Sequence, residues 1–223
     1  MDELNTIQKI AVVTPPLIFA IVLHEVAHGW IANKLGDHTA RDMGRLTLNP
    51  ISHIDLFGTI IMPILCILAH SPIFGYAKPV PINPYNFRDP KKDMAISSIA
   101  GPGVNILMAI SFSFLLRVVI PVIEGSLPKQ SAELFAMPLA LMFGYGIVIN
   151  VALAILNMIP IPPLDGSRIV YWILPNKYAT AYYKLERYGL IILIILLYTN
   201  ILSRIIMPII SPIVTMLLGG NIM

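Results

Sequence analysis

Charged residues are scarce in this chain of 223 residues: only 12% are Asp, Glu, Lys or Arg, while 57% are hydrophobic. A soluble globular domain carries about 25% charged residues. The shortage excludes an ordinary soluble domain and predicts an integral membrane protein that interacts with the lipid bilayer. The net charge of +3 is also too small to indicate a nucleic-acid partner, so we expect none.

Cysteine is almost absent as well. Cys66 is the only one in the sequence, which excludes an internal disulfide. Because Cys66 lies in an apolar run, we interpret it as a packing residue rather than a metal ligand or nucleophile. A cleavable leader is not expected either, since Asp2 and Glu3 stand where a basic segment would precede the first apolar run.

The most informative stretch that is present is His24-Glu25-Val26-Ala27-His28, inside the apolar run 10–31. Histidines four residues apart share one face of a helix, so both imidazoles can reach one metal ion. Glu25 is placed to take a proton from a metal-activated water. Because ionisable groups inside a membrane cost free energy, we expect these three residues to be functional.

A catalytic zinc ion usually has three protein ligands and an open position for water. The best candidate for the third ligand is Asp165, the only acid between Glu133 and Glu186, at the end of a helix that breaks at prolines. The competing interpretation is an Asp that caps a helix. His53 and His70 are weaker candidates, and a surface histidine is the simpler interpretation of His53.

Long apolar runs predict an all-α polytopic protein with about four transmembrane helices. The first three are expected at residues 10–33, 93–120 and 134–159, and the last begins at Tyr188 and ends at about Ser203 or beyond. The stretch 167–187 is mixed in polarity, so we expect it at the membrane interface.

Two polar segments near the HEVAH stretch are expected to be short β or extended structure. Residues 45–48 alternate as a short strand does, and the prolines within 76–92 favour extended backbone. An unwound substrate could add a strand to the edge at 46–48 or at 78–80.

Three motifs carry a resemblance to a known family: HEVAH at 24–28, AGPGVN at 100–105 and NMIPIPPLDG at 157–166. Together they resemble the site-2 protease family of intramembrane zinc metalloproteases, peptidase family M50. The match runs in the family's order from about residue 10 to 170, and two further segments, MGRLTLNPISHID and AKPVPINPYNFR, are similar to the small branch that lacks PDZ and CBS domains.

The resemblance implies an intramembrane zinc metalloprotease that cleaves transmembrane proteins or peptides. We expect one domain over 1–223, with a core at 10–170 and an interfacial segment and last helix at 171–223. One Zn²⁺ would be held by His24, His28 and Asp165.

The resemblance also implies roles for the remaining polar residues. Glu25 would act as general base and then general acid. Asn157 would bind the substrate backbone, and Asn105 would lie close to the metal centre as a second substrate-binding candidate, although both could instead join helices. Asn150 belongs to no motif, and we interpret it as packing.

The three motifs must meet at one depth, so the chain between 28 and 101 can cross the membrane only an even number of times. One apolar run, 56–77, lies there, and its core is too short for a span of about 20 residues. We therefore predict that this run is re-entrant or interfacial.

Charge sets the orientation. Of the 15 Lys and Arg residues, 11 would lie on the side of the active site, which predicts that this side faces the cytoplasm and the N-terminus faces outward. The expected location is the inner or plasma membrane of a prokaryote.

Two other functions fit parts of the sequence. A metal-ion transporter needs further ligands on a partner helix, but 93–120 holds no acid or histidine after Asp93. A catalytically inactive protein that binds membrane segments usually lacks the base or a ligand, and this chain has both. Replacing Glu25 by Gln distinguishes them, because only a protease would keep zinc and lose cleavage.

Overall fold

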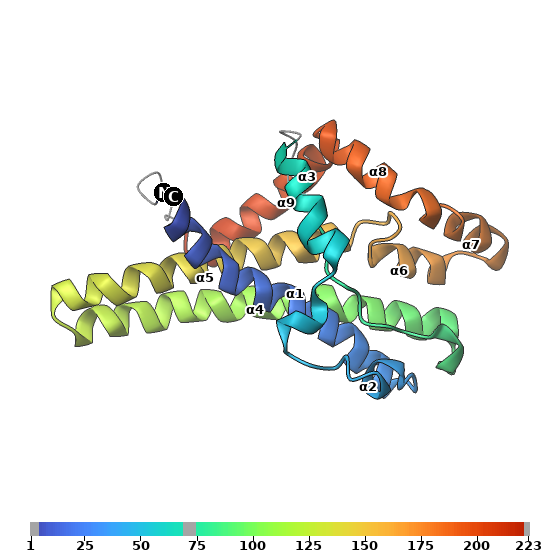
Figure 1. The fold of residues 1–223 in the computed structure, drawn as a ribbon, viewed down its shortest axis with the longest axis horizontal. Coiled ribbons are helices and arrows are strands. Elements are labelled where there is room, and N and C mark those ends of the chain that lie inside the picture. The colour runs from blue at the N-terminus through green and yellow to red at the C-terminus, as the bar shows by residue number, and fades with distance from the viewer. Residues whose placement is uncertain (1–4, 69–74, 221–223) are drawn as a thin grey trace.

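Helices make up the regular structure of the computed structural model, which describes residues 5–68 and 75–220 (Figure 1). The long helices are α1 (Thr6–Lys34), α4 (Pro90–Ser126), α5 (Lys129–Asn157) and α9 (Ile201–Leu218). The short ones are α2 (Thr39–Asp42), α3 (Met62–Leu68), α6 (Gly166–Ile173), α7 (Asn176–Tyr183) and α8 (Glu186–Tyr198), with a π-helix η2 (Leu56–Ile61) and 3-10 helices η1 (Pro50–His53) and η3 (Pro84–Asn86). All four long helices are long and apolar enough to cross a membrane, which confirms the predicted all-α polytopic fold.

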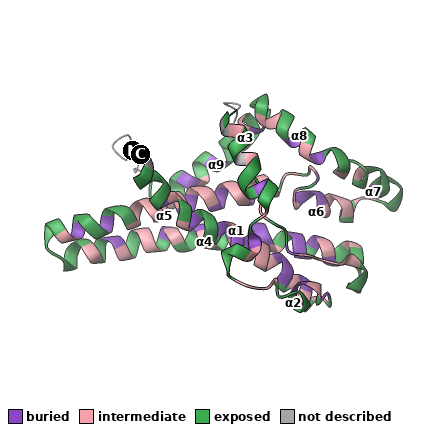
Figure 2. Cartoon of the chain, in the orientation of Figure 1, coloured by how far each residue is buried: buried purple, intermediate pink, exposed green. Residues whose placement is uncertain are grey.

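The centre of the protein is a bundle in which α4 and α5 run antiparallel and α1 packs across both (Figure 1). α4 continues beyond the expected end at residue 120, so only Leu127 and Pro128 separate it from α5. Small and branched residues such as Ala109 and Val151 fill the contact with α9. Figure 2 shows the outer faces of the long helices largely exposed, and these faces are apolar, as lipid-facing helices require.

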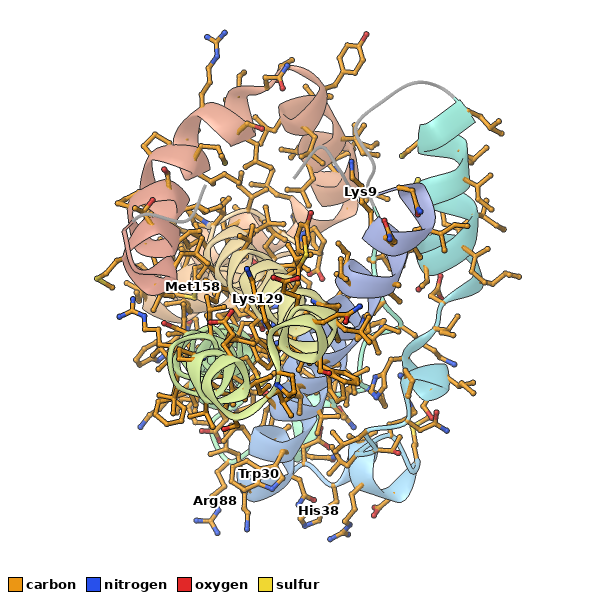
Figure 3. The ribbon with its side chains drawn as sticks, turned by 90° about the vertical axis from the view of Figure 1, so that its left-hand side faces the viewer. Lys9, Trp30, His38, Arg88, Lys129 and Met158 are labelled. Carbon is orange, nitrogen blue, oxygen red and sulfur yellow. The ribbon has the colours of Figure 1, made fainter. Side chains whose placement is uncertain are left out.

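The two ends of α1 carry different residues. Figure 3 shows Lys9 at its N-terminal end, whereas Trp30, His38 and Arg88 gather around its C-terminal end. Trp30 is half exposed, and the ammonium of Lys34 lies 5.5 Å from the centre of its ring. An aromatic residue with a neighbouring cation is typical of the membrane–water interface, which places an interface at this end of α1.

The last predicted helix, from Tyr188 to about Ser203 or beyond, is wrong as a single helix. The apolar run is broken at Asn200, which has a left-handed φ of 57°, a conformation that Asn tolerates better than most residues. α8 therefore has only 13 residues, about 20 Å at ~1.5 Å per residue, and the fourth candidate span is α9. Hydropathy could not reveal this break, because apolar residues continue on both sides of it.

The two described ends of the segment 56–77 lie side by side. Tyr76 N donates to Gly58 O at 3.1 Å, and Thr59 Oγ1 donates to Tyr76 O at 3.0 Å. Residues 69–74 lie outside the described part of the chain, but the bonds on either side show that entry and exit are adjacent. This return agrees with the re-entrant prediction and does not allow a single crossing.

The short strand predicted at residues 45–48 is wrong, since no strand forms within the described residues. These residues are irregular backbone. Of the residues 76–92 that were expected to be extended, 76–83 have no regular secondary structure, but 84–86 form η3 and Pro90 begins α4. Proline is tolerated in the first turn of a helix, and the side chains of Asn83 and Asp89 cap these two turns. The segments 45–48 and 76–83 are joined by the Arg45 side chain, which bonds to Lys78 O and Pro79 O, rather than by a ladder of backbone hydrogen bonds. Alternation of residue types alone could not distinguish a strand from irregular backbone held by side chains.

Candidate metal centre

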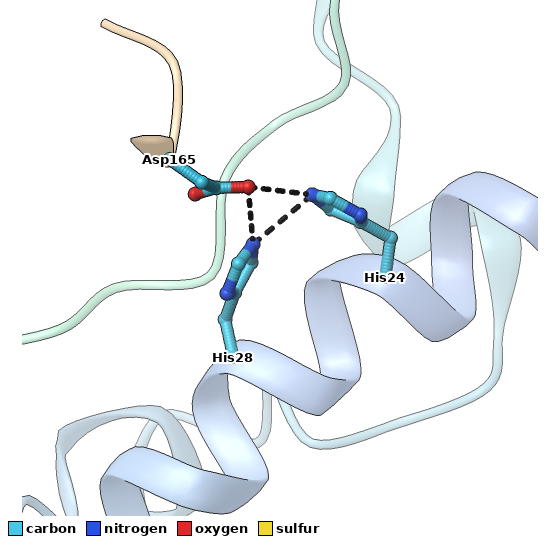
Figure 4. A group of neighbouring side chains, drawn as sticks. All are labelled: His24, His28 and Asp165. Atoms are coloured by element: carbon cyan, nitrogen blue, oxygen red, sulfur yellow. Dashed lines mark hydrogen bonds and ion pairs between the residues drawn. The ribbon is translucent and has the colours of Figure 1, made fainter. Parts of the chain in front are cut away.

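The predicted ligands meet in the middle of the bundle. His24 and His28 lie one turn apart on α1, are 7% and 8% exposed, and have Nε2 atoms 3.0 Å apart. Asp165, immediately before α6, places Oδ2 3.2 Å from His24 Nε2 and 3.3 Å from His28 Nε2 (Figure 4). Three ligand atoms from distant parts of the sequence therefore form a compact triangle.

This triangle fits a zinc ion. A tetrahedral zinc ion with ligand bonds of about 2.0–2.1 Å has neighbouring ligand atoms about 3.3 Å apart. Asp165 Oδ2 is buried and accepts no hydrogen bond within the described part of the chain. A buried carboxylate oxygen normally has a donor, so its position opposite two imidazole nitrogens is explained by a shared cation. Among the described residues, these three form the one group of His, Cys, Asp or Glu that could hold a metal.

Gly101 lets α4 approach the two histidines. A Cβ atom at this position would overlap His28 Nε2 and would lie 2.5 Å from His28 Cε1 and 2.6 Å from His24 Cε1. Any larger side chain would therefore push into both rings. The glycine in the AGPGVN stretch provides room for the ligands, which is a specific reason for its presence.

The outer nitrogen of each histidine is also held. His24 Nδ1 lies 2.6 Å from Asn105 Oδ1, and His28 Nδ1 lies 2.8 Å from Ser97 O. Ser97 Oγ donates to His28 O at 2.9 Å. A side chain of each helix thus bonds to the backbone of the other. Partners of this kind orient metal-binding imidazoles and direct the other ring nitrogen toward the metal.

α8 and α6 support the loop that carries Asp165. Gly189 of α8 packs against Pro162 O so closely that a Cβ atom would overlap it. Arg168 of α6 forms a two-point ion pair with Glu186 of α8, with Nη2–Oε1 at 2.7 Å and Nη1–Oε2 at 3.2 Å. Paired contacts of this geometry resist rotation, so they hold the start of α6 against α8.

Glu25 lies beside the metal ligands and has its own partner. Val80 N donates to Glu25 Oε2 at 2.9 Å. A cavity of about 290 Å³ opens in front of these groups, and its lining includes the three ligands, Glu25, Met94, Asn157 and Arg168. The carboxylate is thus oriented by a backbone N–H at the edge of a space that a substrate segment could enter.

Val80 is positioned by a small scaffold around His53. Arg45 Nη2 donates to Lys78 O at 3.1 Å, and Lys78 N donates to His53 O at 2.9 Å. His53 Nε2 lies 2.9 Å from Thr47 O, and the residue is 3% exposed. The interpretation of His53 as a surface residue is therefore wrong: it is buried because it connects the segments that flank the site.

Asp37 anchors the far end of the same segment. Its Oδ2 accepts from Asn83 N at 2.7 Å, and its Oδ1 accepts from Asn86 Nδ2 at 2.8 Å and Thr39 N at 3.1 Å. Burial raises the pKa of this carboxyl, but the hydrogen bonds from Thr39, Asn86 and Asn83 outweigh that effect and hold the pKa below its usual value. Asp37 is fully buried as an ionised, fully satisfied group.

The remaining candidates take different positions. Asn157 lines the cavity and donates to Leu153 O at 3.0 Å. Asn105 lies behind His24 with no exposed surface, away from that cavity, and His70 lies outside the described residues. Ser97 and Asn150 were not predicted as site residues, and no motif could have indicated them, because their contacts are made across helices.

Comparison with known proteins gives a consistent result. The family model described as Peptidase family M50 matches residues 13–198. YwhC of Bacillus subtilis (strain 168), provisionally named a zinc metalloprotease, is 35% identical over 195 residues, which cover 87% of this chain and 84% of YwhC. Rip2 of Mycolicibacterium smegmatis (strain ATCC 700084 / mc(2)155), with a similar provisional name, is 28% identical over 84% of this chain and 66% of its own length. No solved structure matches the chain.

Proposed function

This chain belongs to peptidase family M50, and from that premise we propose that it is an intramembrane protease of the site-2 type. It would hydrolyse peptide bonds within or near transmembrane segments of other proteins. The observation that carries this proposal is the convergence of His24 Nε2, His28 Nε2 and Asp165 Oδ2 beside Glu25, on a helix long and apolar enough to span a membrane. Family membership and the apolar helices make the chain a multi-pass membrane metalloprotease, and the intramembrane site is the finer proposal.

The chemistry follows from the position of Glu25. A zinc ion held by the two histidines and Asp165 would polarise the substrate carbonyl and make water acidic enough to attack near neutral pH. Glu25 would take the proton of the attacking water and return a proton to the leaving nitrogen. Val80 N–H holds Oε2, so the other carboxylate oxygen is the one available for proton transfer.

A helical substrate has to unwind locally, because its peptide bonds are closed within its own hydrogen-bond ladder. The freed backbone groups then need partners in the enzyme. Asn157 lines the cavity and is our proposed partner near the scissile bond. Lys78 N and Val80 N already bond to His53 O and Glu25, and Arg45 bonds to Lys78 O. Within 46–48, Thr47 O is paired with His53, so we propose the remaining backbone groups of 46–48 as the edge that pairs with substrate.

We propose that the metal site lies toward the cytoplasmic face of a prokaryotic inner or plasma membrane. The support is the excess of Lys and Arg on the side where α1 ends and α4 begins. The family relatives named above come from bacteria. A reporter fused after residue 220 would be expected outside the cytoplasm, because α9 ends on the side where α1 begins (Figure 1).

Glu25→Gln tests the function directly. Cells carrying this variant in place of the native chain should accumulate transmembrane fragments that are absent with the wild type. The purified variant should still bind one zinc ion, because the ligands are intact, while cleavage falls by about 10²–10⁴-fold. Glu133→Gln, an exposed acid on α5, is the matched control and should leave cleavage unchanged.

The same experiment decides between the alternatives. If Glu25→Gln changes zinc flux into vesicles and no fragment accumulates, the transporter function is the correct one. If it leaves both fragments and flux unaltered, the chain binds membrane segments without cutting them.

A further inference from the structure

Three buried polar side chains connect the metal site with the far side of the bundle. His24 Nδ1 lies 2.6 Å from Asn105 Oδ1, and Asn105 Nδ2 donates to Asn150 Oδ1 at 2.8 Å. Both asparagines have no exposed surface, and the three residues belong to α1, α4 and α5. Asn150, which no motif explains, thus bonds directly to the residue behind a metal ligand.

These hydrogen bonds determine which way the Asn105 amide faces. One Nδ2 proton goes to Asn150 Oδ1 and the other goes to Ala20 O at 3.1 Å. Asn150 is held in turn, because its Nδ2 donates to Gly146 O at 2.8 Å and leaves Oδ1 as the acceptor. With both donors of Asn105 engaged, its Oδ1 faces His24 and accepts a hydrogen bond from Nδ1–H.

That orientation selects one form of the His24 ring. A neutral imidazole carries one ring proton, so a proton on Nδ1 leaves the lone pair on Nε2, which faces His28 and Asp165. A reversed Asn105 amide would present its N–H groups to Nδ1. It would then stabilise the other tautomer, whose Nε2–H points at the metal position and cannot bind a cation.

We propose that Asn150 is a positioning residue that acts through Asn105 to hold His24 in its metal-binding tautomer. The inference rests on the proposed zinc site and goes beyond it, because it assigns a role to a residue on α5 that touches neither metal nor cavity. α5 also leads into the loop that carries Asp165.

The competing possibility is that Asn150 only packs α5 against α4. The two roles predict opposite results for two variants of similar size. Asn150→Asp keeps an acceptor for Asn105, and in its protonated form it also keeps a donor for Gly146 O. Asn150→Leu keeps the branched shape and the number of side-chain heavy atoms but removes both polar groups, so it releases the Asn105 amide.

The test is the zinc affinity of the purified full-length protein, measured by competition with a chromogenic chelator. Asn150→Leu should bind zinc 10–100-fold more weakly than wild type, the range found when a partner of a metal ligand is lost. Asn150→Asp should stay within about threefold of wild type on the same scale. Ser113→Ala is the matched control, because Ser113 is buried on α4 and bonds to Leu217 O, far from His24, so zinc affinity should not change.

A second variant covers the case in which Asn150→Leu does not fold. Asn150→Ser can bond back to Gly146 O within α5 but is too short to reach Asn105, so it should also weaken zinc binding tenfold or more. Wild-type affinity in Asn150→Leu or Asn150→Ser, or an equal loss in Asn150→Asp, would overturn the inference. His24→Ala separates the two proposals: if it leaves zinc affinity unchanged, the zinc site itself is wrong, whereas a loss there without a loss in the Asn150 variants refutes only the role of Asn150.

Discussion

Substituting Gly101 by Ala is the most direct test of the packing that builds the metal site. The added methyl group would overlap His28 Nε2 and would lie 2.5–2.6 Å from Cε1 of both ligand rings. Carbon atoms in van der Waals contact lie about 3.5–4.0 Å apart, so the rings or α4 must shift by roughly 1 Å. Zinc–ligand distances tolerate only about 0.2 Å. We therefore expect zinc affinity to fall by at least about 100-fold, or about 2.7 kcal/mol.

The assay compares two nearby glycines on α4. Gly103→Ala adds the same methyl group where no atom lies within 4 Å, so zinc affinity and cleavage should stay at the wild-type level. Its thermal stability should be unchanged or slightly higher, since Ala favours a helix over Gly by about 1 kcal/mol. Zinc content after dialysis against a chelator and the melting temperature are measured for both variants. If Gly101→Ala retains zinc as well as Gly103→Ala does, the close approach of α4 to the histidines is not what holds the site.

Two further predictions concern residues 76–83, which line one side of the cavity and are held at Asn83 by Asp37. Val80→Pro removes the N–H that bonds to Glu25, so cleavage should fall about 10–100-fold with zinc affinity intact, while Val80→Ala, which keeps the N–H, should cleave normally. Equal cleavage by the two variants would show that this bond does not orient the base. Asp37 has a pKa below its ordinary value of 3.8, so its contribution to stability is complete above about pH 4 and is lost as the pH falls through the lower, folded-state pKa. Asp37→Asn should therefore be less stable than wild type at pH 7, and the difference in melting temperature should shrink below pH 4; a difference that stays constant with pH would contradict the role assigned to this carboxylate.

Local spacing in the sequence was enough to predict the parts of the site that lie on one helix. His24 and His28 share a face because a helix repeats every 3.6 residues, and Glu25 follows from its position next to the first of them. Asp165 was predicted because an isolated acid at the end of an apolar helix costs free energy unless it binds a cation or caps a helix. Three of the four membrane spans were predicted from the length of their apolar runs. The return of 56–77 was predicted because the chain must cross the membrane an even number of times between the two motifs that it joins.

Contacts between distant residues were decided only by the tertiary structure. Asn105 is 81 residues from His24, and Asn150 is a further 45 residues along, so no window of sequence could join them into one hydrogen-bond chain. The burial of His53 and the bond from Val80 to Glu25 likewise depend on how the irregular segments 45–48 and 76–83 pack beside α1. The HEVAH stretch by itself determined which side chains can face a metal ion. The packing of α4 and α5 against α1 decides which ring nitrogen of His24 faces the metal position. The packing of residues 76–83 decides which group holds Glu25 in place. Neither can be predicted from the sequence, because hydrogen bonds between distant segments exist only once those segments have packed.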